Sequence, residues 1–125
     1  MSKFFCKDID DLSEFVREGI RFTMIGKNQD TGLYLAKGIF PEEGGETWEV
    51  VKPKKYINPD GNVVMIYPST DTWGVNGWSF GSGQWAEYVW KYGYESFCRM
   101  RNEWRKRKIE ERKNIQNNLY IYDKV

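Results

Sequence analysis

The C-terminal part of the sequence carries basic side chains at helical spacing. Arg101, Arg105, Lys108 and Arg112 follow the spacing i, i+4, i+7 and i+11, which places them along one face of a helix. A guanidinium is a planar fork that matches phosphate oxygens in pairs and stays charged at any physiological pH. Two arginines one helical turn apart can therefore hold a diphosphate from one side. We call these four residues the basic stripe.

The same spacing also fits a solvated helix face. Glu103, Glu110 and Glu111 lie three or four positions from basic residues of the same stretch, which are Lys108 of the stripe and the flanking Arg99, Lys106, Arg107 and Lys113, and they are possible ion-pair partners for them. Met100 and Trp104 adjoin the stripe on the expected apolar side, which would bring cations next to aromatic surface. Both interpretations stay open at this point.

The segment 69–83 is the second candidate for ligand chemistry. It contains four glycines, which allow backbone N–H groups to approach an anion, and three large aromatic residues, Trp73, Trp78 and Phe80. Their rings could stack on a planar base. The segment is neither a Walker A loop, because it lacks a Gly-Lys-Ser/Thr ending, nor a dinucleotide fingerprint. The alternative is that the aromatic rings fill the corner between a sheet and a helix.

Most catalytic and metal chemistries find no support in the residue types. The chain has no histidine, which excludes Ser–His and Cys–His pairs and every zinc site that contains histidine. Cys6 and Cys98 are 92 positions apart, and we expect both to be reduced, buried thiols. No spacing pairs two carboxylates for glycoside hydrolysis. We therefore predict a binding protein that is not an enzyme and that uses no metal and no cofactor.

Two helical stretches and several strands must position these residues. Acidic residues near its start and Gly19 at its end predict a first short helix over 8–19, and 53–61 and 69–83 are expected to be loops. A short helix from Gln84 breaks at Gly93, and a long one follows over about 94–114. The expected strands are 20–25, 33–40, 47–51 and 63–67, with a short β-prone run over 118–123.

Composition limits the class of protein. With 125 residues, 40% of them hydrophobic and 17% aromatic, the chain can form one folded domain and is not a disordered polymer. No apolar run approaches the ~18 residues of a membrane span, and the N-terminus shows no export signal, so we expect a cytoplasmic protein. We predict an α+β fold: an antiparallel β-meander of about four strands, followed by a long C-terminal helical arm. The single domain 1–125 divides into a sheet-rich part (1–68), a glycine and aromatic loop (69–83), and a helical arm with its tail (84–125).

Charge is distributed unevenly along this near-neutral chain. Residues 1–49 carry a net charge of −4, and residues 98–125 carry +5, whereas the whole chain carries only +1. This polarity favours a local anion site or a contact between subunits. It argues against a general nucleic-acid coat, which is usually basic throughout. Aromatic residues on two faces of the helical arm, such as Trp85 and Trp90, also favour a homo-oligomer.

The predicted sheet, the segment 69–83 and the arginine-rich C-terminal helix together resemble the first-described Thoeris anti-defence sponge family of phages. The resemblance implies a small cytosolic oligomer that sequesters cyclic ADP-ribose isomers, the signals of bacterial TIR-domain enzymes, without cleaving them. It implies that Arg101 and Arg105 hold the diphosphate and that Trp78 or Phe80 packs on the base. We count Asn76 and Lys108 with these four as candidate ligand-binding residues.

Two other functions remain as alternatives to sequestration. A protein-directed inhibitor of a bacterial defence complex, of the anti-CRISPR type, would present the arginine-rich helix to an acidic or nucleic-acid-facing surface. A single-strand nucleic-acid binder would use the aromatic rings interleaved with arginine, but the acidic N-terminal half disfavours it.

Overall fold

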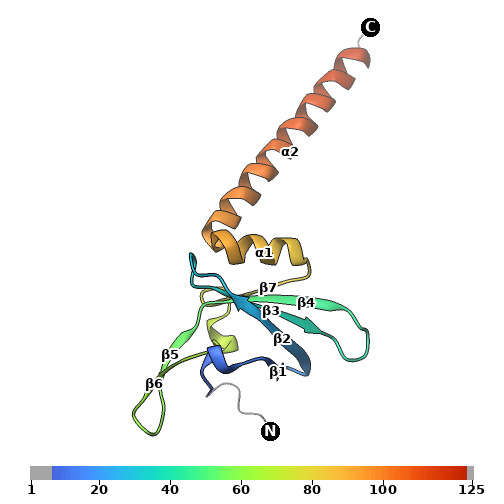
Figure 1. Cartoon of the computed structure of the whole chain (residues 1–125). Helices are drawn as coiled ribbons and strands as arrows, with labels where there is room; N and C mark the ends of the chain where they lie inside the picture. The colour runs from blue at the N-terminus through green and yellow to red at the C-terminus, as the bar shows by residue number, and fades with distance from the viewer. Residues whose placement is uncertain (1–6, 124–125) are drawn as a thin grey trace. The chain divides into compact units, whose positions relative to one another are not determined.

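The fold is α+β, with an antiparallel sheet followed by two helices (Figure 1). The structure is a computed structural model that describes residues 7–123, with side chains described for 7–116. The chain divides into two units, residues 1–93 and 94–125. In chain order the elements are η2 (Ile9–Asp11), β1 (Glu14–Arg17), β2 (Ile20–Lys27), β3 (Tyr34–Ile39), β4 (Glu46–Val51), β5 (Lys54–Ile57), β6 (Val63–Ile66), η3 (Thr70–Thr72), β7 (Gly77–Phe80), α1 (Gly83–Tyr92) and α2 (Tyr94–Asp123).

Five strands form the main sheet of the first unit, in the order β1-β2-β3-β4-β7 with antiparallel neighbours. The chain runs as a meander through β1 to β4, because short turns join consecutive strands. A separate hairpin, β5-β6, lies between β4 and β7 in the sequence and makes a second, two-stranded sheet. The predicted meander of about four strands is confirmed, and β7 adds a fifth strand to its sheet.

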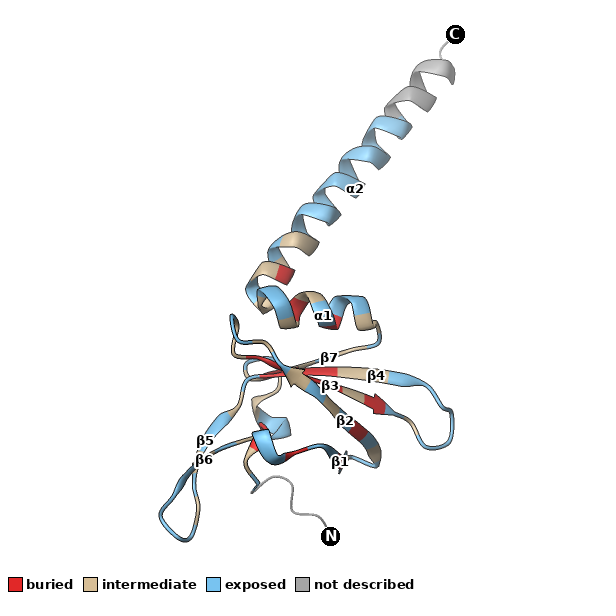
Figure 2. Ribbon diagram, in the orientation of Figure 1, coloured by how far each residue is buried: buried red, intermediate tan, exposed pale blue. Residues whose placement is uncertain are grey.

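The two faces of the main sheet are covered by different parts of the chain. On one face the hydrophobic core includes Phe15, Phe22 and Val51 together with Ile9 of η2 and Tyr67, all at most 4% exposed. The opposite face carries the alternate residues of β3 and β4. There α1 packs on β3, β4 and β7, and its buried residues are Ala86 and Val89 (Figure 2). We call these the core face and the α1 face.

The expected helix over 8–19 is wrong. Only the three-residue η2 is helical, and the chain then forms β1 and turns directly into β2. Glu18 and Gly19 have φ values of 52° and 78°, so Gly19 serves a tight hairpin turn and not a helix end. In β1 Phe15 is buried and Val16 is 51% exposed, the alternation of a strand.

Three other expectations for local structure are also wrong. Residues 54–57, expected in a loop, form β5, which pairs with β6 across a turn held by the Asn58 side chain. Residues 77–80, expected in the glycine and aromatic loop, form β7 on the edge of the main sheet. The β-prone run 118–123 is part of α2. The break at Gly93 is confirmed, since its φ of 89° ends α1.

A close approach at Gly38 gives a test of this sheet. A Cβ added at Gly38 would lie 2.6 Å from a ring carbon of Phe22, in the buried core. We expect Gly38→Ala to lower the free energy of unfolding by about 1–3 kcal/mol, because the core cannot take up the extra volume. Gly26→Ala in β2 is the matched control, since nothing lies within 4 Å of its added Cβ. Urea unfolding followed by tryptophan fluorescence measures both. Equal losses in the two variants would contradict the register of β2 and β3.

Candidate functional site: the basic face of helix α2

Helix α2 is built from residues with high intrinsic helix propensity. Arg, Lys and Glu dominate its sequence, and neither glycine nor proline occurs between Tyr94 and Asp123. From Asn102 to Gln116 every side chain is exposed. Local sequence therefore accounts for the helix, and its basic side chains from Asn102 onward are exposed to solvent.

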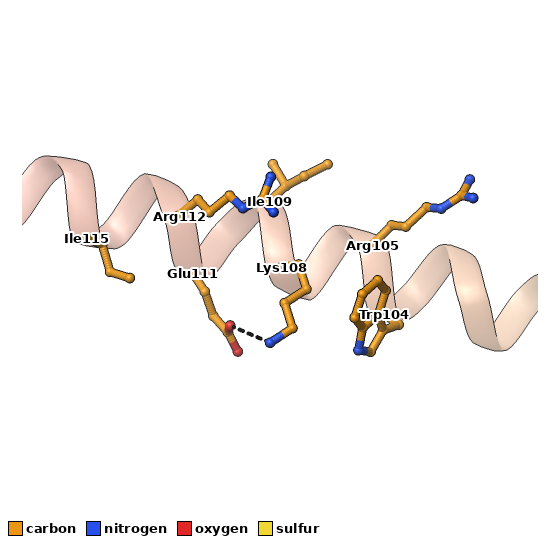
Figure 3. A pocket seen from close by; sticks show the side chains of 7 residues that line it. All are labelled: Trp104, Arg105, Lys108, Ile109, Glu111, Arg112 and Ile115. Carbon is orange, nitrogen blue, oxygen red and sulfur yellow. Dashed lines mark hydrogen bonds and ion pairs between the residues drawn. The ribbon is translucent and has the colours of Figure 1, made fainter.

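The predicted stripe is present on this helix. At 3.6 residues per turn, its four members fall within a sector of about 60° around the helix axis. Three of them, Arg105, Lys108 and Arg112, line a shallow hollow of about 580 Å³ (Figure 3). The fourth, Arg101, is half-buried, and its guanidinium carbon lies 5.6 Å from the Phe97 ring centroid.

The cations of the hollow differ in their partners. The Lys108 ammonium lies 3.4 Å from a carboxylate oxygen of Glu111, an exposed pair of the kind worth at most ~1 kcal/mol. Arg105 and Arg112 form no ion pair with any other described residue of the chain. Two guanidiniums are therefore available to an external anion, and the Lys108 pair is weak enough to exchange.

Apolar side chains border the basic stripe. The Lys108 Nζ lies 5.8 Å from the centroid of the Trp104 ring, which is 52% exposed and also lines the hollow. Ile109 and Ile115 complete the apolar border and are 51% and 58% exposed. A ligand with a phosphate and a planar ring would find both cations and an aromatic surface here.

The six predicted ligand residues fall into two sets. Arg101, Arg105 and Lys108 share one face of α2, as expected. Asn76, Trp78 and Phe80 belong to β7 and the turn that precedes it. The structure therefore brings each set together on its own element.

Trp78 and Phe80 have structural roles in the sheet. Trp78 pairs with Val50, and Phe80 pairs with Trp48, so both rings lie on the α1 face. Trp78 Nε1 donates to the carbonyl of Gly74 at 3.1 Å. Trp78 and Phe80 are both only partly exposed. The alternative in which these rings fill the corner between sheet and helix has this packing in its favour. Trp104 is the large aromatic residue that lines the hollow with the stripe, at a position four before Lys108.

A buried charge cluster lies on the core face of the first unit, and no pattern in the sequence predicts it. Glu49 of β4 is 3% exposed. One carboxylate oxygen accepts from an Arg17 guanidinium nitrogen at 2.6 Å, and the other accepts from the Tyr67 hydroxyl at 2.5 Å. The Arg17 guanidinium also stacks 4.2 Å from the Trp73 ring centroid. Because both Glu49 oxygens are engaged in the core, this cluster stabilises the fold and offers no free base.

Burial raises the pKa values of Glu49 and Tyr67 in this cluster. Burial raises the pKa of Glu49, while the Tyr67 hydrogen bond and the Arg17 charge hold that pKa down in part. The pKa of Tyr67 is raised well above its usual value by burial and by the neighbouring Glu49 charge. Deprotonation of the Tyr67 hydroxyl would put a second negative charge beside Glu49.

The raised pKa of Tyr67 predicts a loss of stability in alkali. The unfolded chain releases the tyrosine proton near pH 10, whereas the folded chain retains it. The contribution of the Tyr67 proton to the free energy of unfolding is therefore complete below pH 10. It is lost as pH rises above 10, at about 1.4 kcal/mol per pH unit for one proton. We expect the slope of unfolding free energy against pH above 10 to be shallower in Tyr67→Phe than in the wild type. Urea unfolding at several pH values measures it, with Tyr56→Phe on β5 as the control. An unchanged slope in Tyr67→Phe would contradict the assignment.

Within residues 7–123, no group of three or more His, Cys, Asp or Glu side chains is placed to hold a metal ion. No helix of the described chain is both long enough and apolar enough to cross a membrane.

Comparison with known proteins adds no relative: no family model, no curated protein and no solved structure matches this chain.

Proposed function

We propose that this protein is a ligand-sequestering binding protein that captures a cyclic nucleotide signal by its phosphates and does not cleave it. The observation that carries the proposal is the hollow on α2. It is lined by two arginines that form no ion pair with another described residue, together with Lys108 and the exposed Trp104 ring. Each feature matches one part of a nucleotide: guanidiniums match phosphate oxygens, and the indole matches the base.

The spacing along α2 suits a diphosphate. One helical turn rises about 5.4 Å, so successive stripe residues can contact neighbouring phosphate groups from one side. The resemblance to the Thoeris anti-defence sponge family narrows the proposed ligand to a cyclic ADP-ribose isomer. It also sets the proposed context: a phage-type anti-defence protein that works in the host cytoplasm as a homo-oligomer.

The absence of cleavage rests on the chemistry of the hollow. Arginine stays protonated at neutral pH and cannot act as a general base. The carboxylate of the hollow, Glu111, is exposed and lies beside Lys108. Binding by this set would stabilise charge on phosphate without supplying a nucleophile for the ribose linkages.

Titration calorimetry with cyclic ADP-ribose as the probe tests this proposal. We expect saturable binding that weakens as salt is added, because phosphate contacts are screened. Inorganic phosphate should compete only weakly, since it lacks the base. No heat with the cyclic probe, together with tight binding of a single-stranded oligonucleotide of steep salt dependence, would instead favour the nucleic-acid alternative.

A protein-directed inhibitor remains the second candidate, and one observation favours it. Trp104, Ile109 and Ile115 are each about half exposed on α2, which is more apolar surface than a small ligand needs. Co-purification of a bacterial defence complex with the tagged protein, without any nucleotide binding, would select this candidate.

A further inference from the structure

Part of the α1 face of the sheet carries exposed apolar side chains. Strand register places Val16, Arg21 and Ile39 side by side across β1, β2 and β3. Val16 is 51% exposed and Ile39 is 49% exposed, although both lie on a face that α1 covers farther along the sheet. We call this surface the open sheet face. It forms a hollow of about 530 Å³ that is lined by Val16, Gly19, Arg21, Ile39, Phe40, Pro41 and Gly44.

Acidic residues surround the open sheet face. Glu42 and Glu43 are exposed in the turn between β3 and β4, next to Pro41 and Gly44 of the hollow. Glu14, also exposed, lies at the start of β1. These acids belong to the first 49 residues, whose net charge is −4. Arg21 is exposed within the hollow itself, so the surface is basic at its centre and acidic at its border. A partner for this surface should therefore bring apolar side chains to the hollow and basic side chains to the acidic border.

Helix α2 has that chemistry. It combines the half-exposed Trp104, Ile109 and Ile115 with the basic stripe. These residues lie within 98–125, whose net charge is +5. Pairing two α2 helices along their stripes would instead bring like charges together, which is unfavourable. The charge pattern of the chain thus selects an acidic sheet, and not a second helix, as the surface that α2 contacts.

We propose that two copies of this chain associate reciprocally, with α2 of each copy docked on the open sheet face of the other. The inference rests on the proposed function in one respect, since the partner's sheet would supply the second wall of the ligand site. Arg21, which forms no ion pair with another described residue, would add a third unpaired guanidinium to the ligand site.

The mass of the full-length protein in solution, measured by light scattering without ligand, tests the docking directly. We expect twice the mass of one chain for the wild type. Ile39→Glu on the sheet and Ile109→Glu on α2 should each weaken the dimer about 1000-fold, because the roughly 30-fold loss of one hot-spot residue occurs in both contacts. Ile57→Glu is the control, because Ile57 is 63% exposed on β5, outside both surfaces. Circular dichroism confirms that each variant is folded.

Mixing the two disrupted variants distinguishes helix-to-sheet docking from helix-to-helix pairing. One buried glutamate abolishes the contact that it enters, so each variant alone has two broken contacts. The mixture can form a heterodimer with one broken contact and one undamaged contact, between the intact α2 of the Ile39→Glu chain and the intact sheet of the Ile109→Glu chain. We expect a heterodimer in the mixture where each variant alone is monomeric. A monomeric wild type, a dimer insensitive to Ile39→Glu, or no heterodimer in the mixture would each overturn the proposal. Because no ligand is present, loss of the dimer is separate from any failure of nucleotide binding.

Discussion

Replacing Glu49 with alanine is expected to lower the free energy of unfolding by about 3–5 kcal/mol, the usual effect of removing one partner of a buried ion pair. Glu49 is the acceptor for both Arg17 and Tyr67, and its side chain is 4% exposed while that of Arg17 is 10% exposed. The substitution leaves a guanidinium and a hydroxyl in the core without their acceptor. Such a loss is a large fraction of the stability of a domain of this size.

A control of the same residue type lies on the same strand. Glu46 pairs with Lys37 at 3.0 Å, but its side chain is 52% exposed. Glu46→Ala should therefore cost at most ~1 kcal/mol. Chemical unfolding of both variants measures the difference. Similar losses in Glu49→Ala and Glu46→Ala would contradict a buried, fully engaged Glu49.

Replacing Arg105 with alanine is expected to weaken binding of the cyclic nucleotide about 10- to 100-fold, the effect of losing a hydrogen-bonding charge on phosphate. Arg105 lines the hollow and forms no ion pair with another described residue, so its loss removes ligand contacts and leaves no partner unsatisfied. Arg112→Ala should also weaken binding, since Arg112 lines the same hollow and forms no ion pair with another described residue. Calorimetry with the cyclic probe measures both variants.

Arg99→Ala is the matched control for these substitutions. Arg99 lies on α2 but far around the helix from the stripe, where its guanidinium donates to Ser96 at 3.3 Å. The Arg99→Ala substitution removes one positive charge from α2, as Arg105→Ala does, but it changes no residue that lines the hollow. Equal weakening by Arg99→Ala and Arg105→Ala would show that the net charge of the helix matters and that the stripe is not a site.

Local patterns in the sequence were sufficient to predict much of the fold. Alternation between apolar and polar residues located β2, and β-prone runs bounded by turn residues located β3, β4 and β6. Gly93 located the break between the helices. The acidic residues near its start and Gly19 at its end make the segment 8–19 resemble a helix, whereas in the structure Gly19 serves a hairpin turn.

Features that depend on tertiary pairing could not be predicted. Arg17, Glu49 and Tyr67 are far apart in the sequence and meet only through strand register. The strand at 77–80 has no β-branched residue, and its pairing with β4 is what makes it a strand. The basic stripe, in contrast, was predictable because it depends only on the period of one continuous helix. That Arg112 and Trp104 line the hollow, and Arg101 does not, required the positions of the side chains.

The most direct test of the central claim is to identify what the protein holds. The full-length protein is purified from cells that make cyclic ADP-ribose signals and then denatured, and the released small molecules are identified by mass spectrometry. Our account predicts the intact cyclic nucleotide from the wild type and much less of it from Arg105→Ala. Release of a hydrolysed, linear product, or of the same amount of nucleotide from both proteins, would contradict it.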